Sequence, residues 1–159
     1  MKIDIFILFF FYFISIFSTL GYGIFLQGLN NISKNNKICL GYSGLIGVFF
    51  LITYSYISHF FYSHGIYHNL FFLILGLLLL YISYLKKSIN KLEINILTIV
   101  FLIIFFSFLI FKSHDDFPYY HFPYTYYLNQ NSLIFGIGHL NHGFRTPSSL
   151  FYFNSLFYL

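Results

Sequence analysis

Two adjacent carboxylates, Asp115 and Asp116, follow a long apolar run within the segment SHDDFPYYHFP. The chain has only four acidic residues, so half of its carboxylates lie at this one place. Such a pair at a membrane face can bind a divalent cation such as Mg²⁺ or Mn²⁺, or one carboxylate can act as general base. Scarce ionisable residues at a membrane mark a candidate functional site. We therefore predict that Asp115 and Asp116 are catalytic and are the metal ligands; a solvated pair is the alternative.

A second polar segment, FGIGHLNHGFR, ends at Arg145, the only arginine of the chain. Its three glycines permit tight turns and close approach of a ligand to the backbone. A guanidinium can grip a phosphate group through two parallel hydrogen bonds. We predict a substrate-binding set of His121, Asn141, His142 and Arg145. Snorkelling to lipid headgroups is the alternative for Arg145.

Histidines offer a competing metal hypothesis. His64 and His68 are four residues apart in HGIYH, and His139 and His142 are three apart in HLNH. Both spacings allow imidazoles on a helix to share a metal. Membrane di-iron enzymes use several HxxHH-type clusters on the cytoplasmic side, a pattern that this chain lacks. A His-ligated metalloprotein is therefore the weaker alternative, and most of these side chains are expected to form hydrogen bonds or lie at the interface.

The elements that must position these residues are membrane helices. Mean hydropathy is +0.77, and Phe and Tyr contribute 25 and 16 residues, a composition that excludes a soluble single-core domain. A span needs about 20 apolar residues. The sequence predicts an all-α polytopic bundle with four spans, over residues 5–26, 39–58, 69–85 and 94–111. In the second span, glycines spaced by three residues allow close helix approach.

A fifth apolar segment, residues 148–159, is too short for a complete span. We therefore expect one transmembrane domain over residues 1–159 that is the N-terminal part of a longer protein. The single Cys39 allows no intrachain disulfide. Basic residues form no cluster suited to nucleic acid, so the expected partner is membrane lipid.

Loop charges predict the orientation through the positive-inside rule. Two loops placed in the cytoplasm carry five basic residues, Lys34, Lys37, Lys86, Lys87 and Lys91, whereas Lys2, Lys112 and Arg145 fall outside. The acidic pair then faces the extracytoplasmic side of the inner membrane. All seven histidines do so as well: His59, His64, His68, His114, His121, His139 and His142. In the loop 112–147, Pro118, Pro123 and the tyrosines that follow them fit an interfacial helix.

The runs HDDFPYYHFP, GHLNHGFR and SSLF together carry a resemblance over residues 114–159. This region resembles a family of largely uncharacterised bacterial polytopic membrane proteins whose layout is similar to that of the GT-C glycosyltransferases. The resemblance implies an Asp that acts as base or metal ligand during transfer of sugar from a polyprenyl-phosphate carrier. In GT-C enzymes the acidic loop usually follows the first span, whereas here it follows the fourth.

The expected function is transfer of a polyprenyl-phosphate-linked sugar to a surface glycan at the extracytoplasmic face. Asp115 or Asp116 would deprotonate the acceptor hydroxyl, and the other would bind a divalent ion or order the loop. His121 and His142 would hydrogen-bond sugar or phosphate, and Arg145 would offset charge on the leaving phosphate. The alternative from another class is a non-catalytic polytopic subunit or transporter for cell-surface polysaccharide.

Overall fold

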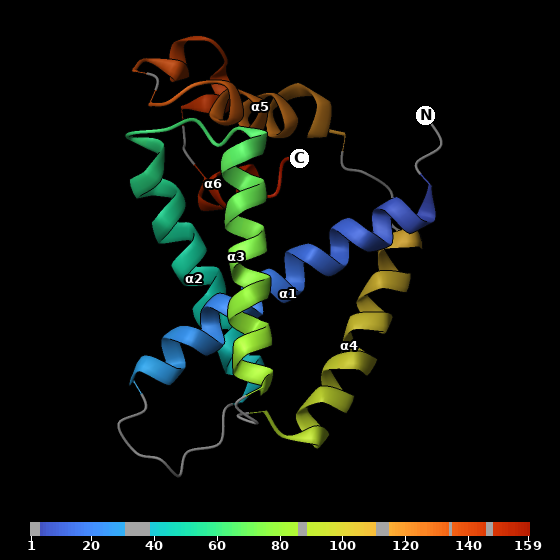
Figure 1. The fold of residues 1–159 in the computed structure, drawn as a ribbon. Helices are drawn as coiled ribbons and strands as arrows, with labels where there is room; N and C mark the ends of the chain where they lie inside the picture. Colours follow the sequence, from blue (N-terminus) through green and yellow to red (C-terminus); the bar gives the residue numbers. More distant parts are fainter. Residues whose placement is uncertain (1–3, 31–38, 86–88, 111–114, 134, 146–147) are drawn as a thin grey trace. The chain divides into compact units, whose positions relative to one another are not determined.

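A computed structural model describes residues 4–30, 39–85, 89–110, 115–133, 135–145 and 148–159. These residues form helices and loops with no strand among them. Four long helices, α1 (Ile5–Asn30), α2 (Leu40–His59), α3 (Ile66–Leu85) and α4 (Lys91–Ile110), are labelled in Figure 1. Each is long and apolar enough to cross a membrane. The prediction of an all-helical, multi-pass membrane protein is confirmed.

Helix ends differ from the predicted ones by up to four residues. Helix α1 continues past residue 26 to Asn30, and the side-chain oxygen of Gln27 accepts a hydrogen bond from the Ser43 hydroxyl of α2. A polar residue with a partner on the next helix can stay helical, so hydropathy alone ends the element too early. Helix α3 begins at Ile66 rather than at residue 69.

The chain divides into two compact units. Unit 1 comprises Met1–Phe50 and Leu73–Phe111, and unit 2 comprises Leu51–Phe72 and Lys112–Leu159. Helices α2 and α3 each contribute to both units.

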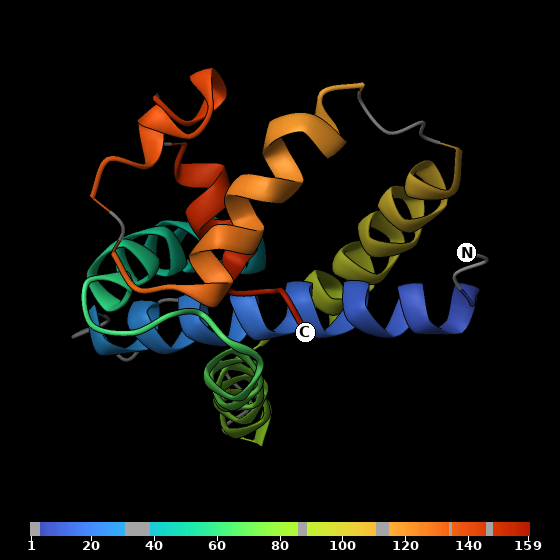
Figure 2. The same cartoon turned by 90° about the horizontal axis from the view of Figure 1, so that it is seen from above.

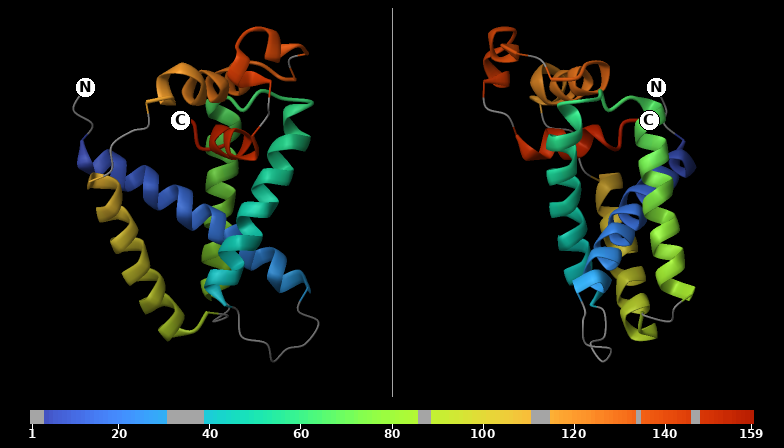
Figure 3. Two further views of the ribbon diagram at one scale, coloured as in Figure 1. Left: turned by 180° about the vertical axis from the view of Figure 1, so that it is seen from behind. Right: turned by 60° about the vertical axis from the view of Figure 1, so that its left-hand side comes forward.

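In unit 1, small residues allow α1 to cross α2 and α3 closely (Figure 3). A Cβ atom at Gly21 would lie 1.8 Å from the carbonyl oxygen of Gly76 in α3. A Cβ atom at Gly47 of α2 would lie 2.1 Å from the carbonyl oxygen of Thr19. Such backbone approach is the usual way in which membrane helices gain packing contacts without a hydrophobic driving force between them. Of the glycines spaced by three, Gly47 makes the close contact, whereas Gly41 has nothing within 4 Å.

Helix α4 is joined to the rest of unit 1 at its middle and in its first turn. The Tyr12 hydroxyl of α1 donates a 3.1 Å hydrogen bond to the carbonyl of Phe101, and the two rings are 4.6 Å apart. In the first turn of α4, Glu93 accepts a 3.1 Å hydrogen bond from the backbone N–H of Leu40. That carboxylate caps the first turn of α2, whose N–H groups have no partner within the helix.

Unit 2 contains the polar segment that follows α4 and the last helix. A π-helical turn, η1 (Phe117–His121), leads into α5 (Phe122–Gln130), and both elements carry proline in their first turn. Two short 3₁₀ helices follow, η2 (Ile137–His139) and η3 (His142–Phe144), and then α6 (Ser149–Ser155). Helices α5 and α6 lie side by side in Figure 2. They share a core of Tyr124, Leu128, Phe144 and Phe151.

Helical structure was predicted within residues 112–147, and α5 confirms it. The segment 148–159, expected as the start of a fifth span, forms the seven-residue helix α6 followed by a turn. Its Phe151 is buried in the core shared with α5, and Leu156 is fully buried. Several residues that the topology prediction used lie outside the described residues: Lys2, Lys34, Lys37, Lys86, Lys87, Lys112 and His114.

Candidate functional site

Asp115 and Asp116 lie at the entry to η1, and both residues are exposed. The carbonyl oxygen of Asp116 accepts hydrogen bonds from the N–H groups of Tyr119 and Tyr120, each 3.2 Å long. The acidic pair is therefore held by the backbone of a helical turn, and Pro118 fixes φ in that turn. This local structure presents the pair at the surface of unit 2.

The two polar segments that the sequence singled out meet in the structure. The Asn141 amide donates a 3.4 Å hydrogen bond to the carbonyl of Tyr119, which is 22 residues earlier in the chain. Its side-chain oxygen accepts from the N–H of Gly143 at 2.9 Å. A Cβ atom at Gly143 would lie 3.0 Å from the Tyr120 side chain. Asn141, predicted to bind substrate, thus holds one segment against the other in this structure.

Three further predicted residues lie in or beside these segments. His121 is half-buried, with its ring stacked on Tyr120 at 4.2 Å and edge-on to Phe151 at 5.1 Å. His142 and Arg145 are exposed, and the N–H of Arg145 donates to the carbonyl of His142 at 3.3 Å. After the orientation predicted from the loop charges, we call the exposed set Asp115, Asp116, Asn141, His142 and Arg145 the outer polar surface.

The histidine pair that suggested a metal site is already hydrogen-bonded. The ring of His64 lies 2.9 Å from the Ser58 hydroxyl and 2.6 Å from the Ser155 hydroxyl, one at each nitrogen. The ring of His68 lies 2.9 Å from the Tyr54 hydroxyl and 3.1 Å from the Asn69 side-chain oxygen. Within the described part of the chain, no three His, Cys, Asp or Glu side chains gather to hold a metal. The geometry of His64 and His68 fits hydrogen bonding.

A buried polar cluster surrounds His64, and sequence reasoning missed it. Asn69 and Asn129 are 0% and 3% exposed. Both amides donate to the same two carbonyl oxygens: Asn69 to His64 and Ser155 at 2.8 Å each, and Asn129 to His64 at 2.5 Å and to Ser155 at 2.8 Å. We call this arrangement the asparagine clamp. It joins α3, the loop before it, α5 and α6.

Hydrogen bonds also fix the protonation of His64. The Ser155 hydroxyl donates to the carbonyl of Tyr152 at 2.7 Å, so toward His64 Nδ1 it acts as acceptor. The Ser58 hydroxyl lies 2.9 Å from His64 Nε2 and 3.4 Å from the carbonyl of Ser55, so its shorter contact is with the ring. Burial, together with the neighbouring His59 and His68, lowers the pKa of His64 to about 3. The imidazole is neutral at physiological pH.

A serine next to a histidine suggests nucleophilic catalysis, but this pair lacks what that chemistry needs. Catalytic histidines are oriented by a further group on the nitrogen away from the nucleophile, usually a carboxylate. His64 has a serine on each nitrogen, and both His64 and Ser155 are 0% exposed. The cluster is therefore a structural one. In the sequence, the only signal for it is an asparagine at the start of an apolar span and another in a helix rich in tyrosine.

Comparison of the chain with protein families, with characterised proteins and with solved structures finds no match.

Proposed function

We propose that this membrane protein transfers a sugar from a polyprenyl-phosphate donor to a surface glycan at the extracytoplasmic face. The observation that supports the proposal is the contact between the two polar segments. Asn141 binds the Tyr119 carbonyl, and Gly143 packs on Tyr120. Candidate base residues and the single arginine are thereby carried on neighbouring segments of one unit, although they are far apart in sequence.

Each residue of the outer polar surface has a chemical role in the proposal. An exposed carboxylate, Asp115 or Asp116, accepts the proton of the acceptor hydroxyl as that oxygen attacks the sugar. Arg145 stabilises the negative charge that develops on the departing lipid phosphate. His142 is exposed and His121 half-buried, and their imidazoles hydrogen-bond sugar or phosphate oxygens. Asn141 acts as a positioning residue through its bonds to both segments.

A divalent cation is compatible with this surface by donor type. Mg²⁺ is usually held by one or two carboxylates and keeps several waters, with substrate phosphates as further ligands. Asp115 and Asp116 supply such carboxylates and are exposed to water. When bound, the ion would neutralise charge on the donor phosphate.

The test is replacement of each carboxylate by the isosteric amide. Asp115→Asn, Asp116→Asn and the double variant remove the base and the charge while keeping side-chain volume. Loss of general-base catalysis lowers the rate by about 100-fold or more, so at least one single variant and the double variant should abolish glycan labelling in cells. Membrane insertion of each variant is verified by protease protection.

Asp4→Asn is the matched control. Asp4 is also an exposed carboxylate near a helix start, and its side chain accepts a 3.0 Å hydrogen bond from the N–H of Phe6. Asparagine caps helices about as well as aspartate, so this variant should label normally. Wild-type labelling by an inserted Asp115→Asn, Asp116→Asn double variant would refute catalysis by this pair. A loss of assembly or glycan binding with normal turnover would favour the non-catalytic subunit instead.

A further inference from the structure

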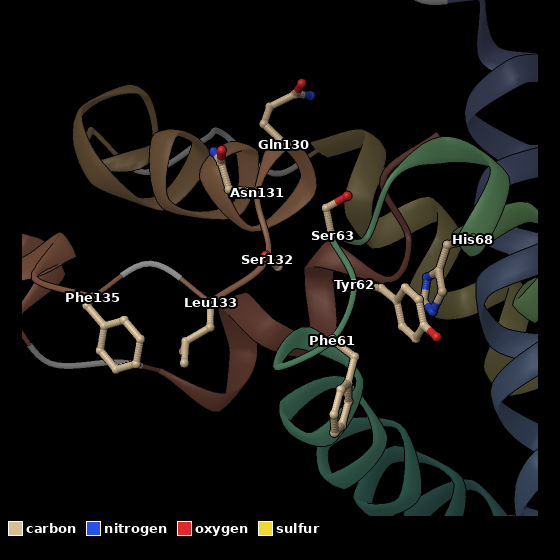
Figure 4. A pocket seen from close by; sticks show the side chains of 9 residues that line it. All are labelled: Phe61, Tyr62, Ser63, His68, Gln130, Asn131, Ser132, Leu133 and Phe135. Carbon is tan, nitrogen blue, oxygen red and sulfur yellow. The ribbon is translucent and has the colours of Figure 1, made fainter.

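An open cleft of about 810 Å³ lies in unit 2, away from the residues of the outer polar surface. Figure 4 shows its walls. Phe61, Tyr62 and Ser63 come from the turn after α2, and Gln130, Asn131 and Phe135 come from the end of α5 and the segment after it. Its volume falls within the range of about 300–1,000 Å³ that is typical of small-molecule sites.

The two segments that form the walls are joined by hydrogen bonds. The N–H of Leu133 donates to the carbonyl of His59 at 3.0 Å, and the His59 ring donates through Nε2 to the carbonyl of Asn131 at 2.9 Å. The N–H of His64 donates to the carbonyl of Leu128 at 3.2 Å. These bonds, together with the asparagine clamp, hold both walls in fixed register. The cleft is therefore preformed, which reduces the entropy lost on binding.

The lining carries no formal charge. None of its residues is Asp, Glu, Lys or Arg. His68 lines the cleft, and its Nδ1 faces the Asn69 side-chain oxygen, which can only accept, so that nitrogen carries the proton. Its Nε2 lies 2.9 Å from the Tyr54 hydroxyl, so both ring nitrogens already have partners within the protein. A ligand with a phosphate or carboxylate would find no cation here.

The lining combines exposed aromatic rings with amides and hydroxyls. Phe61, Tyr62 and Phe135 are 71%, 66% and 89% exposed, so their faces are accessible. Ser63, Gln130 and Asn131 supply hydroxyl and amide groups that both donate and accept. A sugar ring can make both kinds of contact. The C–H groups on one face of the ring can pack on an aromatic side chain, and the hydroxyl groups at its edge can form hydrogen bonds with amides. A lipid tail would leave these polar groups without partners.

We propose that this cleft binds neutral sugar residues of a glycan chain. The site is separate from the carboxylates of the outer polar surface and does not depend on catalysis by them. Because the cleft is open, a glycan chain can bind through a few of its sugar residues while both ends of the chain extend outside the cleft. If the transfer reaction proposed above takes place, the cleft is a place where the acceptor glycan is held.

The experiment uses the full chain in lipid nanodiscs and saturation-transfer difference NMR. The probes are two neutral trisaccharides, N,N′,N″-triacetylchitotriose and maltotriose, and one acidic trisaccharide, trigalacturonate. We expect saturable transfer to at least one neutral probe and weaker transfer to the acidic one. Tyr62→Ala and Phe135→Ala should each weaken the affinity by about tenfold, the scale of one lost aromatic contact.

Tyr67→Ala is the matched control, because Tyr67 lies nearby in sequence, is 91% exposed and does not line the cleft. This variant should bind as the wild type does. The exposed lining rings can be removed without a cavity in the core, so misfolding does not obscure the result. The Asp115→Asn, Asp116→Asn double variant should also keep its affinity, which separates this inference from the proposed reaction.

Three results would overturn the inference. One is the absence of saturable transfer to both neutral probes. Another is unchanged affinity in the Tyr62→Ala and Phe135→Ala variants, which would place the sugar elsewhere. A third is loss of binding in the double Asp variant, which would place it on the outer polar surface.

Discussion

The asparagine clamp predicts strong coupling between two residues that are 60 positions apart in the chain. Replacing Asn69 by alanine leaves the carbonyls of His64 and Ser155 with the amide of Asn129, and replacing Asn129 leaves them with the amide of Asn69. Asn129→Ala loses two donated hydrogen bonds, whereas Asn69→Ala loses three, because Asn69 also donates to the carbonyl of Tyr158 at 2.7 Å. Asn69→Ala also removes the side-chain oxygen that pairs with His68 Nδ1. At about 0.5–1.5 kcal/mol per bond, we expect the free energy of unfolding to fall by about 1–3 kcal/mol in Asn129→Ala and by more in Asn69→Ala.

The double variant should lose more than the sum of the two. The carbonyl of His64 then loses both amide donors, while that of Ser155 keeps a longer bond, 3.4 Å, from the N–H of Tyr158. A buried acceptor left without a donor destabilises the fold by about 1–3 kcal/mol. The coupling energy of the Asn69→Ala, Asn129→Ala cycle should therefore be about 1–3 kcal/mol. The double variant should be less stable than the sum of the single variants predicts, because either amide alone can still donate to both carbonyls.

Reversible unfolding in detergent micelles, titrated with denaturant, measures the cycle. Asn154→Ala is the matched control, since Asn154 is exposed and immediately precedes Ser155. A surface replacement of this kind should change stability by less than about 0.5 kcal/mol. If the two clamp replacements were additive within about 0.5 kcal/mol, the shared-carbonyl arrangement would be refuted.

Two further predictions concern pH and helix packing. The pKa of His64 is lowered from 6.5 to about 3 in the folded protein, so between these pH values the unfolded chain binds the proton more readily. The free energy of unfolding is therefore highest above pH 6.5 and decreases as the pH falls toward 3. A His64→Gln variant should lose this part of the pH dependence in unfolding titrations, and an unchanged slope would contradict the assignment. Gly21→Ala places a Cβ atom 1.8 Å from the Gly76 carbonyl and should destabilise the protein by about 1–3 kcal/mol. Gly28→Ala, with nothing within 4 Å, should be neutral or slightly stabilising, and equal stability of the two variants would count against the crossing.

Length and hydropathy predicted the four membrane helices because a span must satisfy its own backbone hydrogen bonds and exclude charge. The same rule misplaced the start of α3, where Ile66, Tyr67 and His68 are helical although Tyr67 and His68 are less apolar than the residues that follow. His68 can lie inside the helix because Tyr54 and Asn69 satisfy its ring. Such hydrogen-bond partners are brought together only by the tertiary structure. A hydropathy value calculated from the sequence takes no account of them.

The candidate site was predictable in part. Charged residues are few in this chain, and for that reason Asp115, Asp116 and Arg145 were predicted as site residues. The segments that carry them do lie in contact. The clamp was not predictable, because its members come from three helices and a loop. His64 and Ser155 are 91 residues apart, and no periodic pattern connects them. Asparagine in an apolar helix indicates that a partner exists but does not say which one.

The two units are held together by different kinds of contact. Lipid tails are as apolar as leucine, so burial of apolar side chains gives membrane helices little reason to associate. In unit 1, Gly21, Gly47 and Gly76 remove side-chain volume and allow backbones to meet. In unit 2, the amides of Asn69 and Asn129 bind carbonyls of other segments instead. Hydrogen bonds specify direction and register, which close packing alone does not. A unit that must present both a polar surface and a preformed cleft therefore gains more from amides than from glycines.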